Sequence, residues 1–180
     1  MSDIWAVLSD VHGYAAPLDR ALEEVRKSGV SRIYFLGDLT QGGREEAECL
    51  QLLKTHRVIS VAGNHCRQSR TWGDVPAEVQ TYLKSLDLVI QYEDSCFSHE
   101  NPLKECVIRR GIEPFIKDGG IRTTEQAKYL FDKGMSEFSR TRLFFVGHTH
   151  DPAVWECDGR SVVKLPLTEA IQLEKNKRYI

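Results

Sequence analysis

Three short apolar runs, separated by two amphipathic stretches, open the chain and constrain its fold more than any other feature. In order along the chain, these five segments are residues 4–9, 17–27, 33–36, 45–54 and 58–62. Leu18 and Leu22 recur at helical spacing in the first amphipathic stretch, and Gly29 is placed to end that helix. The order strand, helix, strand, helix, strand is typical of a parallel sheet with crossover helices, so we expect an α/β fold.

The second half of the chain has a different pattern, in which predicted strands lie close together in the sequence. Helices are expected at residues 77–85 and 124–131, and strands at residues 88–92, 95–98, 143–146, 154–157, 161–165 and 177–180. Asp158-Gly159 is a strong hairpin signal between two of these strands, so we expect antiparallel pairs in the sheet. Residues 101–120 have glycine breaks and no clean period, which leaves this segment as a candidate lid or substrate loop.

Length and composition limit the classes of protein to consider. The chain has 180 residues, which fits one domain with a single sizeable core. Its formal net charge of −2 argues against nucleic acid as a partner and favours a small substrate. No apolar run approaches the roughly 20 residues that span a bilayer, and the N-terminus lacks the features of a secretory signal. The five cysteines are odd in number and scattered, which is typical of reduced thiols in a cytoplasmic protein.

Polar residues suited to metal binding follow five of the apolar runs, at the point where each predicted strand ends. They are Asp10, His12, Asp38, Asn64, His65, His99, His148 and His150. Five of the six histidines belong to this set, and only His56 lies elsewhere. Open α/β sheets place their ligand sites at the carboxyl ends of strands, so we expect these side chains to lie together.

Coordination chemistry gives a reason for this set of residue types. Two cations about 3.5–4 Å apart need a shared carboxylate, with imidazole and carbonyl ligands completing each shell. The alternation in Asp10-x-His12, repeated at residues 148 and 150, would put each pair on one face of an extended backbone. Glycines at positions 13, 37, 63 and 147 would let the backbone turn sharply beside the site. Each motif alone is more often an ordinary turn, but all of them in this order are improbable as structure alone.

These motifs resemble those of the calcineurin-like metallophosphoesterases. The matching residues are Asp10-Val11-His12, Gly37-Asp38 with Gly43, Gly63-Asn64-His65, His99 and Gly147-His148-Thr149-His150. The motifs extend over most of the chain, whose compact length is most similar to the small prokaryotic phosphodiesterase branch. The resemblance implies one metallophosphoesterase domain over residues 1–180, built as a four-layer αββα sandwich of two mixed β-sheets flanked by helices.

The resemblance also implies a role for each motif residue. One cation would be held by Asp10, His12, Asp38 and His150, and the other by Asp38, Asn64, His99 and His148. A water or hydroxide between the two cations would attack phosphorus, while His65 would contact a phosphate oxygen and protonate the leaving group. The substrate would be contacted by Asn64, His65 and Arg67. Two divalent cations are expected, with manganese first and iron, zinc, nickel or magnesium as alternatives.

The chain departs from the family pattern at several positions. Cys66 stands where an acidic residue is common, and a small buried thiol is its expected role. Gln41 and Gly42 stand where protein phosphatases carry Asp-Arg, which argues against a Ser/Thr protein phosphatase. Glu100 stands where the family usually has glycine, so this loop is expected to differ. Relatives continue beyond Ile180 into a loop beside the active site, so a shortened C-terminal end is expected.

We therefore expect a metal-dependent phosphoric ester hydrolase that cleaves a phosphodiester or a small phosphate ester. The alternative is a binding or scaffold module that keeps this fold with little or no catalysis. Such a module would be expected to have replaced some of the ligand positions, and none is replaced here. A structure-selective nuclease would bring basic surface or further domains, so a small phosphate ester is the expected partner. The oligomeric state stays open.

Overall fold

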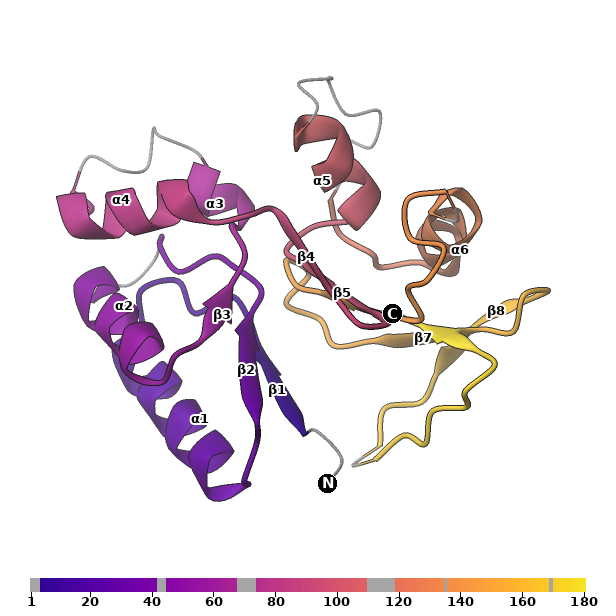
Figure 1. Ribbon diagram of the computed structural model, residues 1–180, viewed down its shortest axis with the longest axis horizontal. Coiled ribbons are helices and arrows are strands. Elements are labelled where there is room, and N and C mark those ends of the chain that lie inside the picture. The colour runs from indigo at the N-terminus through magenta and orange to yellow at the C-terminus, as the bar shows by residue number, and fades with distance from the viewer. Residues whose placement is uncertain (1–3, 42–44, 68–73, 110–118, 135, 169) are drawn as a thin grey trace. The chain divides into compact units, whose positions relative to one another are not determined.

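The computed structural model describes residues 4–41, 45–67, 74–109, 119–134, 136–168 and 170–180. The chain divides into two compact units, the N-terminal unit (Met1–Leu88) and the C-terminal unit (Val89–Ile180), which can be followed by colour in Figure 1. The described residues form a three-stranded sheet in the N-terminal unit and a six-stranded sheet in the C-terminal unit. The expected α/β fold with two sheets and flanking helices is confirmed.

The N-terminal unit alternates strands and helices as the apolar pattern predicts. Its elements are β1 (Trp5–Leu8), α1 (Ala15–Lys27), β2 (Arg32–Phe35), α2 (Glu46–Thr55), β3 (Ile59–Ser60), α3 (Asn64–Arg67) and α4 (Ala77–Ser85). The strands run parallel in the order β1-β2-β3, with Leu8 opposite Phe35 and Phe35 opposite Ser60. All three strands therefore end at the same edge of the sheet, where the chain continues into the motif residues.

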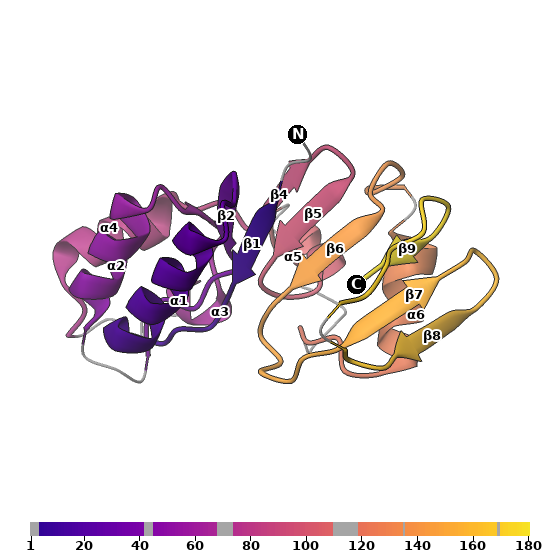
Figure 2. The same ribbon diagram turned by 90° about the horizontal axis from the view of Figure 1, so that it is seen from below.

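The helices of the N-terminal unit cover one face of its sheet (Figure 2). Leu22 of α1 and Leu50 of α2 are buried with Phe35 of β2 in one apolar core. Because strand side chains alternate, Tyr34 points to the other face, where its ring contacts Trp5 with centroids 5.7 Å apart. This burial on both faces explains why the runs read as continuous apolar stretches.

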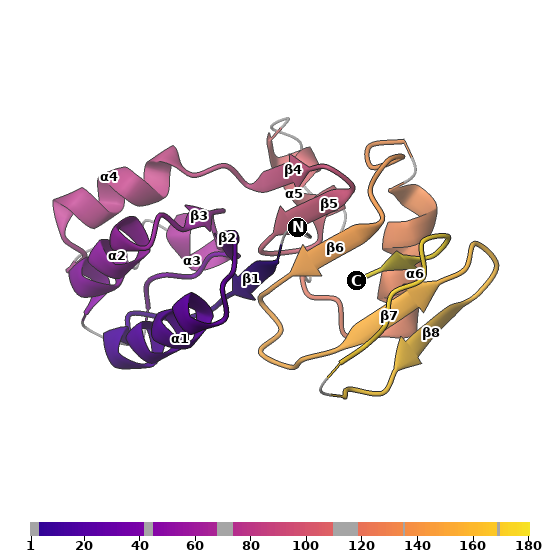
Figure 3. The same ribbon diagram turned by 60° about the horizontal axis from the view of Figure 1, so that its bottom comes forward.

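The C-terminal unit is a mixed sheet packed against helices. Its elements are β4 (Val89–Tyr92), β5 (Ser95–Ser98), α5 (Pro102–Arg109), α6 (Thr124–Lys133), β6 (Leu143–Val146), β7 (Val154–Cys157), β8 (Val162–Leu165) and β9 (Arg178–Tyr179). The strand order is β4-β5-β6-β9-β7-β8; β5, β6 and β9 run parallel, and the other neighbours pair antiparallel (Figure 3). Helix α6 begins at a capping box between Thr123 and Gln126 and buries Leu130 in the core.

Strand β9 lies between β6 and β7 although it follows both in the sequence. Tyr179 is opposite Leu143 of β6 and opposite Glu156 of β7. The guanidinium of Arg178 stacks over the ring of Phe131 at 5.4 Å and donates to that residue's carbonyl at 3.1 Å. This short strand therefore joins the two parts of the sheet and contacts the end of α6.

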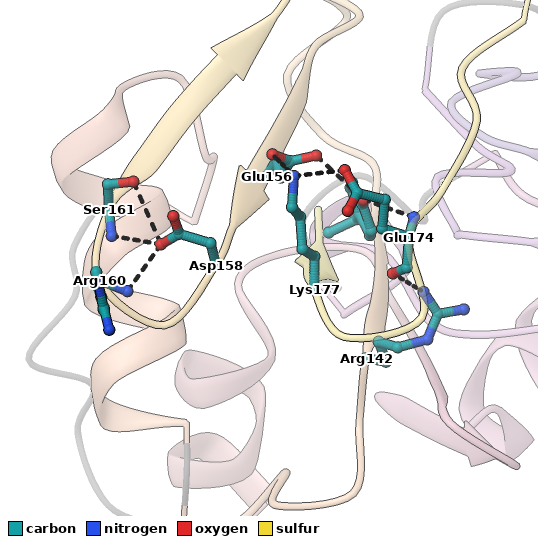
Figure 4. A network of polar contacts seen from close by, with 8 residues as sticks. Arg142, Glu156, Asp158, Arg160, Ser161, Glu174 and Lys177 are labelled. Atoms are coloured by element: carbon teal, nitrogen blue, oxygen red, sulfur yellow. Dashed lines mark hydrogen bonds and ion pairs between the residues drawn. The ribbon is translucent and has the colours of Figure 1, made fainter.

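Charged residues hold the turn before β9 and the hairpin between β7 and β8 (Figure 4). Nζ of Lys177 lies 2.8 Å from Oε1 of Glu156 and 2.6 Å from Oε1 of Glu174. In the hairpin, Oδ1 of Asp158 accepts from the backbone N–H groups two and three residues further on, each at 2.8 Å. Gly159 has φ of 88°, so the hairpin predicted at Asp158-Gly159 is confirmed.

Two helices were not expected from the sequence, α3 and α5. Helix α5 takes up the start of the segment 101–120, and residues 110–118 lie outside the described residues, so the lid interpretation stays a prediction. The single domain with a shortened C-terminal end also stays a prediction. Over the described parts of the chain, no helix is both long enough and apolar enough to cross a bilayer.

Candidate functional site

Two strand ends of the N-terminal unit bring Asp10 and Asp38 together. The backbone N–H of Asp10 donates to the carbonyl of Gly37, and that of His12 donates to the carbonyl of Asp38, both at 3.0 Å. These bonds continue the pairing of β1 with β2 beyond the last strand residues. The loop that carries Asp10 and His12 is therefore tied to the loop that carries Asp38.

Three motif residues of this unit have a left-handed backbone conformation. The φ angle is 58° at Asp10, 49° at His12 and 57° at Asp38. Residues other than glycine rarely adopt such angles, which persist only where the surrounding structure holds them. The expectation of an extended backbone through Asp10 and His12 is therefore wrong, because both residues lie in a turn past the end of β1. The turn still brings the side chains close, with Nε2 of His12 3.7 Å from Oδ1 of Asp10.

Asp38 is buried, with 1% of its surface exposed. Its Oδ1 accepts from the backbone N–H of His65 at 3.0 Å, and its Oδ2 lies 3.8 Å from Nε2 of the same histidine. Gly63 packs so closely against the carboxylate that a Cβ there would lie 1.9 Å from Oδ1 of Asp38. Gly63 was expected to allow a turn. The structure shows that it is also needed because its backbone lies against the carboxylate of Asp38, where a side chain would not fit.

A backbone carbonyl orients the ring of His12. Nδ1 of His12 lies 3.1 Å from the carbonyl oxygen of Thr40. Because a carbonyl only accepts, the neutral ring carries its proton on Nδ1, and the lone pair of Nε2 is left for a metal ion. Sequence reasoning missed Thr40, and it had no signal to find, because a backbone carbonyl is common to every residue type.

Asn64 and His65 open the short helix α3 instead of an extended segment. On a helix, successive side chains are about 100° apart, so the side chains of Asn64 and His65 leave the backbone in different directions. Arg67 is at the end of the same helix and partly buried. Cys66 is buried, and burial raises the pKa of its thiol, which fits the small buried residue expected at that position.

The C-terminal unit brings His99 and His148 together by the same device of neighbouring parallel strands. Ser98, the last residue of β5, is opposite Val146, the last residue of β6, and each histidine follows shortly after. Nε2 of His99 lies 3.3 Å from Nδ1 of His148, and the rings meet edge to face with centroids 5.2 Å apart. His99 is fully buried, so its ring is fixed by the packing around it.

The loop after β6 repeats the left-handed pattern of the first motif. The φ angle is 69° at His148 and 54° at His150. The extended backbone expected for this pair is therefore wrong as well. Thr149 between them closes a tight turn, with its N–H donating to the carbonyl of Gly147 at 2.8 Å. His150 is exposed, unlike His99.

Glu100, which stands where the family usually has glycine, is a buried charged residue. Its carboxylate is buried and lies 2.5 Å from Nζ of Lys104 in the first turn of α5. A Cβ on Gly119 would lie 1.8 Å from Oε1 of Glu100, so the chain beyond the undescribed residues 110–118 packs directly on this carboxylate. A buried ion pair thus follows His99 directly. Gly42 and Gly43, used in the sequence argument, lie outside the described residues.

The candidate metal ligands form one set in each unit. The set in the N-terminal unit is Asp10, His12, Asp38 and Asn64, and the set in the C-terminal unit is His99, His148 and His150. The carboxylate oxygens of Asp10 and Asp38 and the imidazole nitrogens of His12, His99 and His150 are among the donor atoms that could hold a metal ion. Imidazole suits manganese, iron and zinc, and an amide oxygen is a hard ligand that these ions accept. The residues present therefore fit a divalent transition metal.

Comparison with known proteins gives a consistent picture. Residues 4–165 match the sequence model of the calcineurin-like phosphoesterase superfamily domain. The chain is 28% identical to "Uncharacterized protein MJ0912" of Methanocaldococcus jannaschii, over 97% of this chain and 72% of that protein. It is also similar in fold to the crystal structure of a metallophosphoesterase from Sphaerobacter thermophilus, with 23% identity and a TM-score of 0.67. That likeness covers 99% of this chain and 75% of the other.

Proposed function

Because the chain belongs to the calcineurin-like phosphoesterase superfamily, we propose that it hydrolyses a phosphate ester with two divalent cations. The ligands of the first cation are Asp10, His12, Asp38 and His150. The ligands of the second are Asp38, Asn64, His99 and His148. The observation that carries the proposal is the 3.3 Å separation of the ring nitrogens of His99 and His148, which suits two ligands of one metal ion.

When bound, the two cations lower the pKa of a water molecule and neutralise charge on the phosphoryl oxygens. The protein's own contribution is to hold the ligand side chains in fixed positions. Asp38 serves both cations, and its burial and its hydrogen bond from His65 keep its two oxygens in fixed positions. The carbonyl of Thr40 keeps His12 in the tautomer that binds through Nε2.

We assign proton transfer to His65. Its Nε2 lies 3.8 Å from Asp38, close to the shared ligand without being needed in the ligand set. An imidazole in that position can donate to a phosphoryl oxygen and then to the departing oxygen. Asn64 and Arg67, on the same short helix, are the further groups that contact the substrate.

The substrate class is a phosphodiester or a small phosphate ester. Gln41 stands where a protein phosphatase carries the acidic partner of its phosphate-binding arginine, and neutral Gly42 replaces that arginine. A dianionic monoester gains most from such a bidentate cation, whereas a monoanionic diester needs it less. Diesters should therefore be cleaved more efficiently than alkyl monoesters.

A hydrolysis screen with metal analysis tests the proposal. The purified protein is stripped of metal, reloaded with manganese, magnesium, zinc or iron, and assayed on phosphodiesters and monoesters. We expect two cations per chain and hydrolysis that depends on them, with Asp38→Ala losing both cations and Asn64→Ala losing less. Two cations still bound to Asp38→Ala would contradict its bridging role. Full metal loading with no turnover of any ester would favour the scaffold alternative.

A further inference from the structure

Glu45 connects the loop of the first motif to the start of α2. Its backbone N–H donates to the carbonyl of Gly13 at 3.1 Å, and its Oε2 accepts from the backbone N–H of Ala15 at 2.8 Å. Gly13 directly follows His12, and Gly13 and Ala15 flank Tyr14, the N-cap residue of α1. One residue, distant in the sequence, therefore holds the exit of the ligand loop by two hydrogen bonds.

Helix α1 needs this contribution because its own sequence supplies no N-terminal cap. Within α1, all of which the structure describes, the side chain of the N-cap Tyr14 makes no capping hydrogen bond and the first turn has no acidic residue. The first N–H groups of a helix have no partner inside it, and a carboxylate is the strongest acceptor for them. The carboxylate of Glu45 takes that place and also suits the positive end of the helix dipole.

The loop held in this way is the one with the least favourable backbone. Asp10, His12 and Gly13 all have positive φ, at 58°, 49° and 75°. On the sheet side, the N–H groups of Asp10 and His12 are bound to the loop after β2. Glu45 provides the attachment on the helix side. A strained loop keeps its geometry only when both ends are held, so loss of either attachment should let it relax.

We propose that Glu45 is a positioning residue that holds Asp10 and His12 in the geometry for binding a cation. This inference rests on the proposed function, because it concerns the ligands assigned to the first cation. Glu45 acts through hydrogen bonds to the loop and does not itself contact the metal ion. Its side chain reaches the loop from the N-cap position of α2, and the residue is exposed, so its replacement leaves the apolar core intact.

The test compares Glu45→Ala, Glu45→Gln and Glu48→Ala. Glutamine keeps an acceptor oxygen and removes the charge, whereas alanine removes both; Glu48 is an exposed glutamate on the same helix and serves as the control. Titration calorimetry with manganese gives the affinity, and the visible spectrum of the cobalt-loaded protein reports the ligand geometry. We expect about tenfold weaker binding of one cation and an altered cobalt spectrum in Glu45→Ala, a loss typical of residues that support metal ligands from outside the shell. Glu45→Gln should keep most of the wild-type affinity and most of the wild-type cobalt spectrum. Glu48→Ala should match the wild type in both measurements.

Three outcomes would overturn the inference. Wild-type affinity and spectrum in Glu45→Ala would show that the loop does not need the contact. An equal loss of affinity in Glu45→Gln would mean that the charge of Glu45, and not its hydrogen bond, is responsible. An equal loss of affinity in Glu48→Ala would mean that removing any carboxylate from this helix has the same effect. The wild-type protein separates this inference from the proposed function, because manganese bound without ester hydrolysis would contradict the function alone.

Discussion

Nε2 of His99 and Nδ1 of His148 lie 3.3 Å apart in the C-terminal unit. Metal–nitrogen bonds of about 2.0–2.1 Å place two ligands of one tetrahedral cation about 3.4 Å apart. The two rings are held at this separation by the parallel pairing of β5 with β6, which puts Ser98 opposite Val146. The fold thus sets the spacing of a ligand pair from within one unit.

The first prediction follows from that pair. His99→Ala and His148→Ala should each remove one cation per chain, and the double variant should lose no more than either single one, because ligands of one site act as a unit. Metal content after dialysis, measured by mass spectrometry, checks this. His56→Ala is the matched control, since His56 is at the end of α2 and outside both ligand sets. Loss of two cations in the double variant would place the two rings on different metals.

Gly63→Ala adds only one methyl group, but it should displace the carboxylate of Asp38 and weaken metal binding. The added methyl group would lie 1.9 Å from Oδ1 of Asp38, so either the backbone or the shared carboxylate must move, at a cost of about 1–3 kcal/mol. Gly29→Ala is the control: it has φ of 68° but no atom within 4 Å, so only the conformational cost of about 1–2 kcal/mol applies. Both should lower the melting temperature, but only Gly63→Ala should also weaken manganese binding. Unchanged binding in Gly63→Ala would mean that the carboxylate tolerates displacement.

His65→Asn should lower kcat by about 10²- to 10⁴-fold, the usual contribution of general acid catalysis, while metal content stays unchanged. The deficit should shrink for a leaving group such as nitrophenolate, which needs little protonation. Steady-state kinetics with a good and a poor leaving group check this, with His56→Asn as the control histidine. A deficit of equal size for both substrates would assign His65 to phosphate binding, and loss of a cation would make it a ligand.

The buried thiols make a prediction about pH. The structure describes all five cysteines, and none forms a disulfide. Burial, with neighbouring glutamates, raises the pKa of Cys49 from 9.0 to about 12, and burial raises that of Cys96 as well. The folded state therefore keeps protons that the unfolded chain releases, so this contribution to stability is complete below about pH 9 and is lost between pH 9 and 12. Unfolding by urea should show the decline.

Alkylation supplies an independent check at pH 8. Iodoacetamide should label Cys49 and Cys96 only after unfolding, because the thiolate is the reactive form and both side chains are buried. Cys106 is partly buried and should be labelled first. Peptide mass spectrometry gives the order of labelling. Labelling of Cys49 as fast as Cys106 in the folded protein would contradict the prediction.

Much of the fold was predictable because local pattern and tertiary burial agree. Strand β2 is buried on both faces at Tyr34 and Phe35, and β1 is partly buried along its length, so hydrophobicity alone finds both. Helix α5 could also have been predicted from the sequence. Oδ1 of Asn101 caps it by accepting from the backbone N–H of Leu103 at 3.0 Å, and Pro102 is the first helical residue. Asn-Pro is a known helix-start signal that the glycine breaks nearby obscured. Helix α3, with four residues, is too short for a periodic pattern.

The geometry of the candidate site was not predictable, because it depends on contacts distant in the sequence. The left-handed conformations of Asp10 and His12 are set by hydrogen bonds to the loop after β2. Aspartate and histidine accept such angles more readily than most residues, but nothing in the local sequence requires them. The roles of Thr40 and Glu45 are likewise visible only once the loops are placed in space.

The position of β9 has a consequence for how the protein is made. During synthesis, β4, β5 and β6 can pair as soon as they leave the ribosome, and β7 and β8 can form a hairpin by local contacts. These two pieces cannot join into one continuous sheet until Arg178 and Tyr179 arrive, because β9 is the strand that pairs with both β6 and β7. Until then β6 and β7 each have an open edge, the kind of surface that captures other chains. A nascent chain stalled before residue 178 should therefore depend on chaperones far more than a released one.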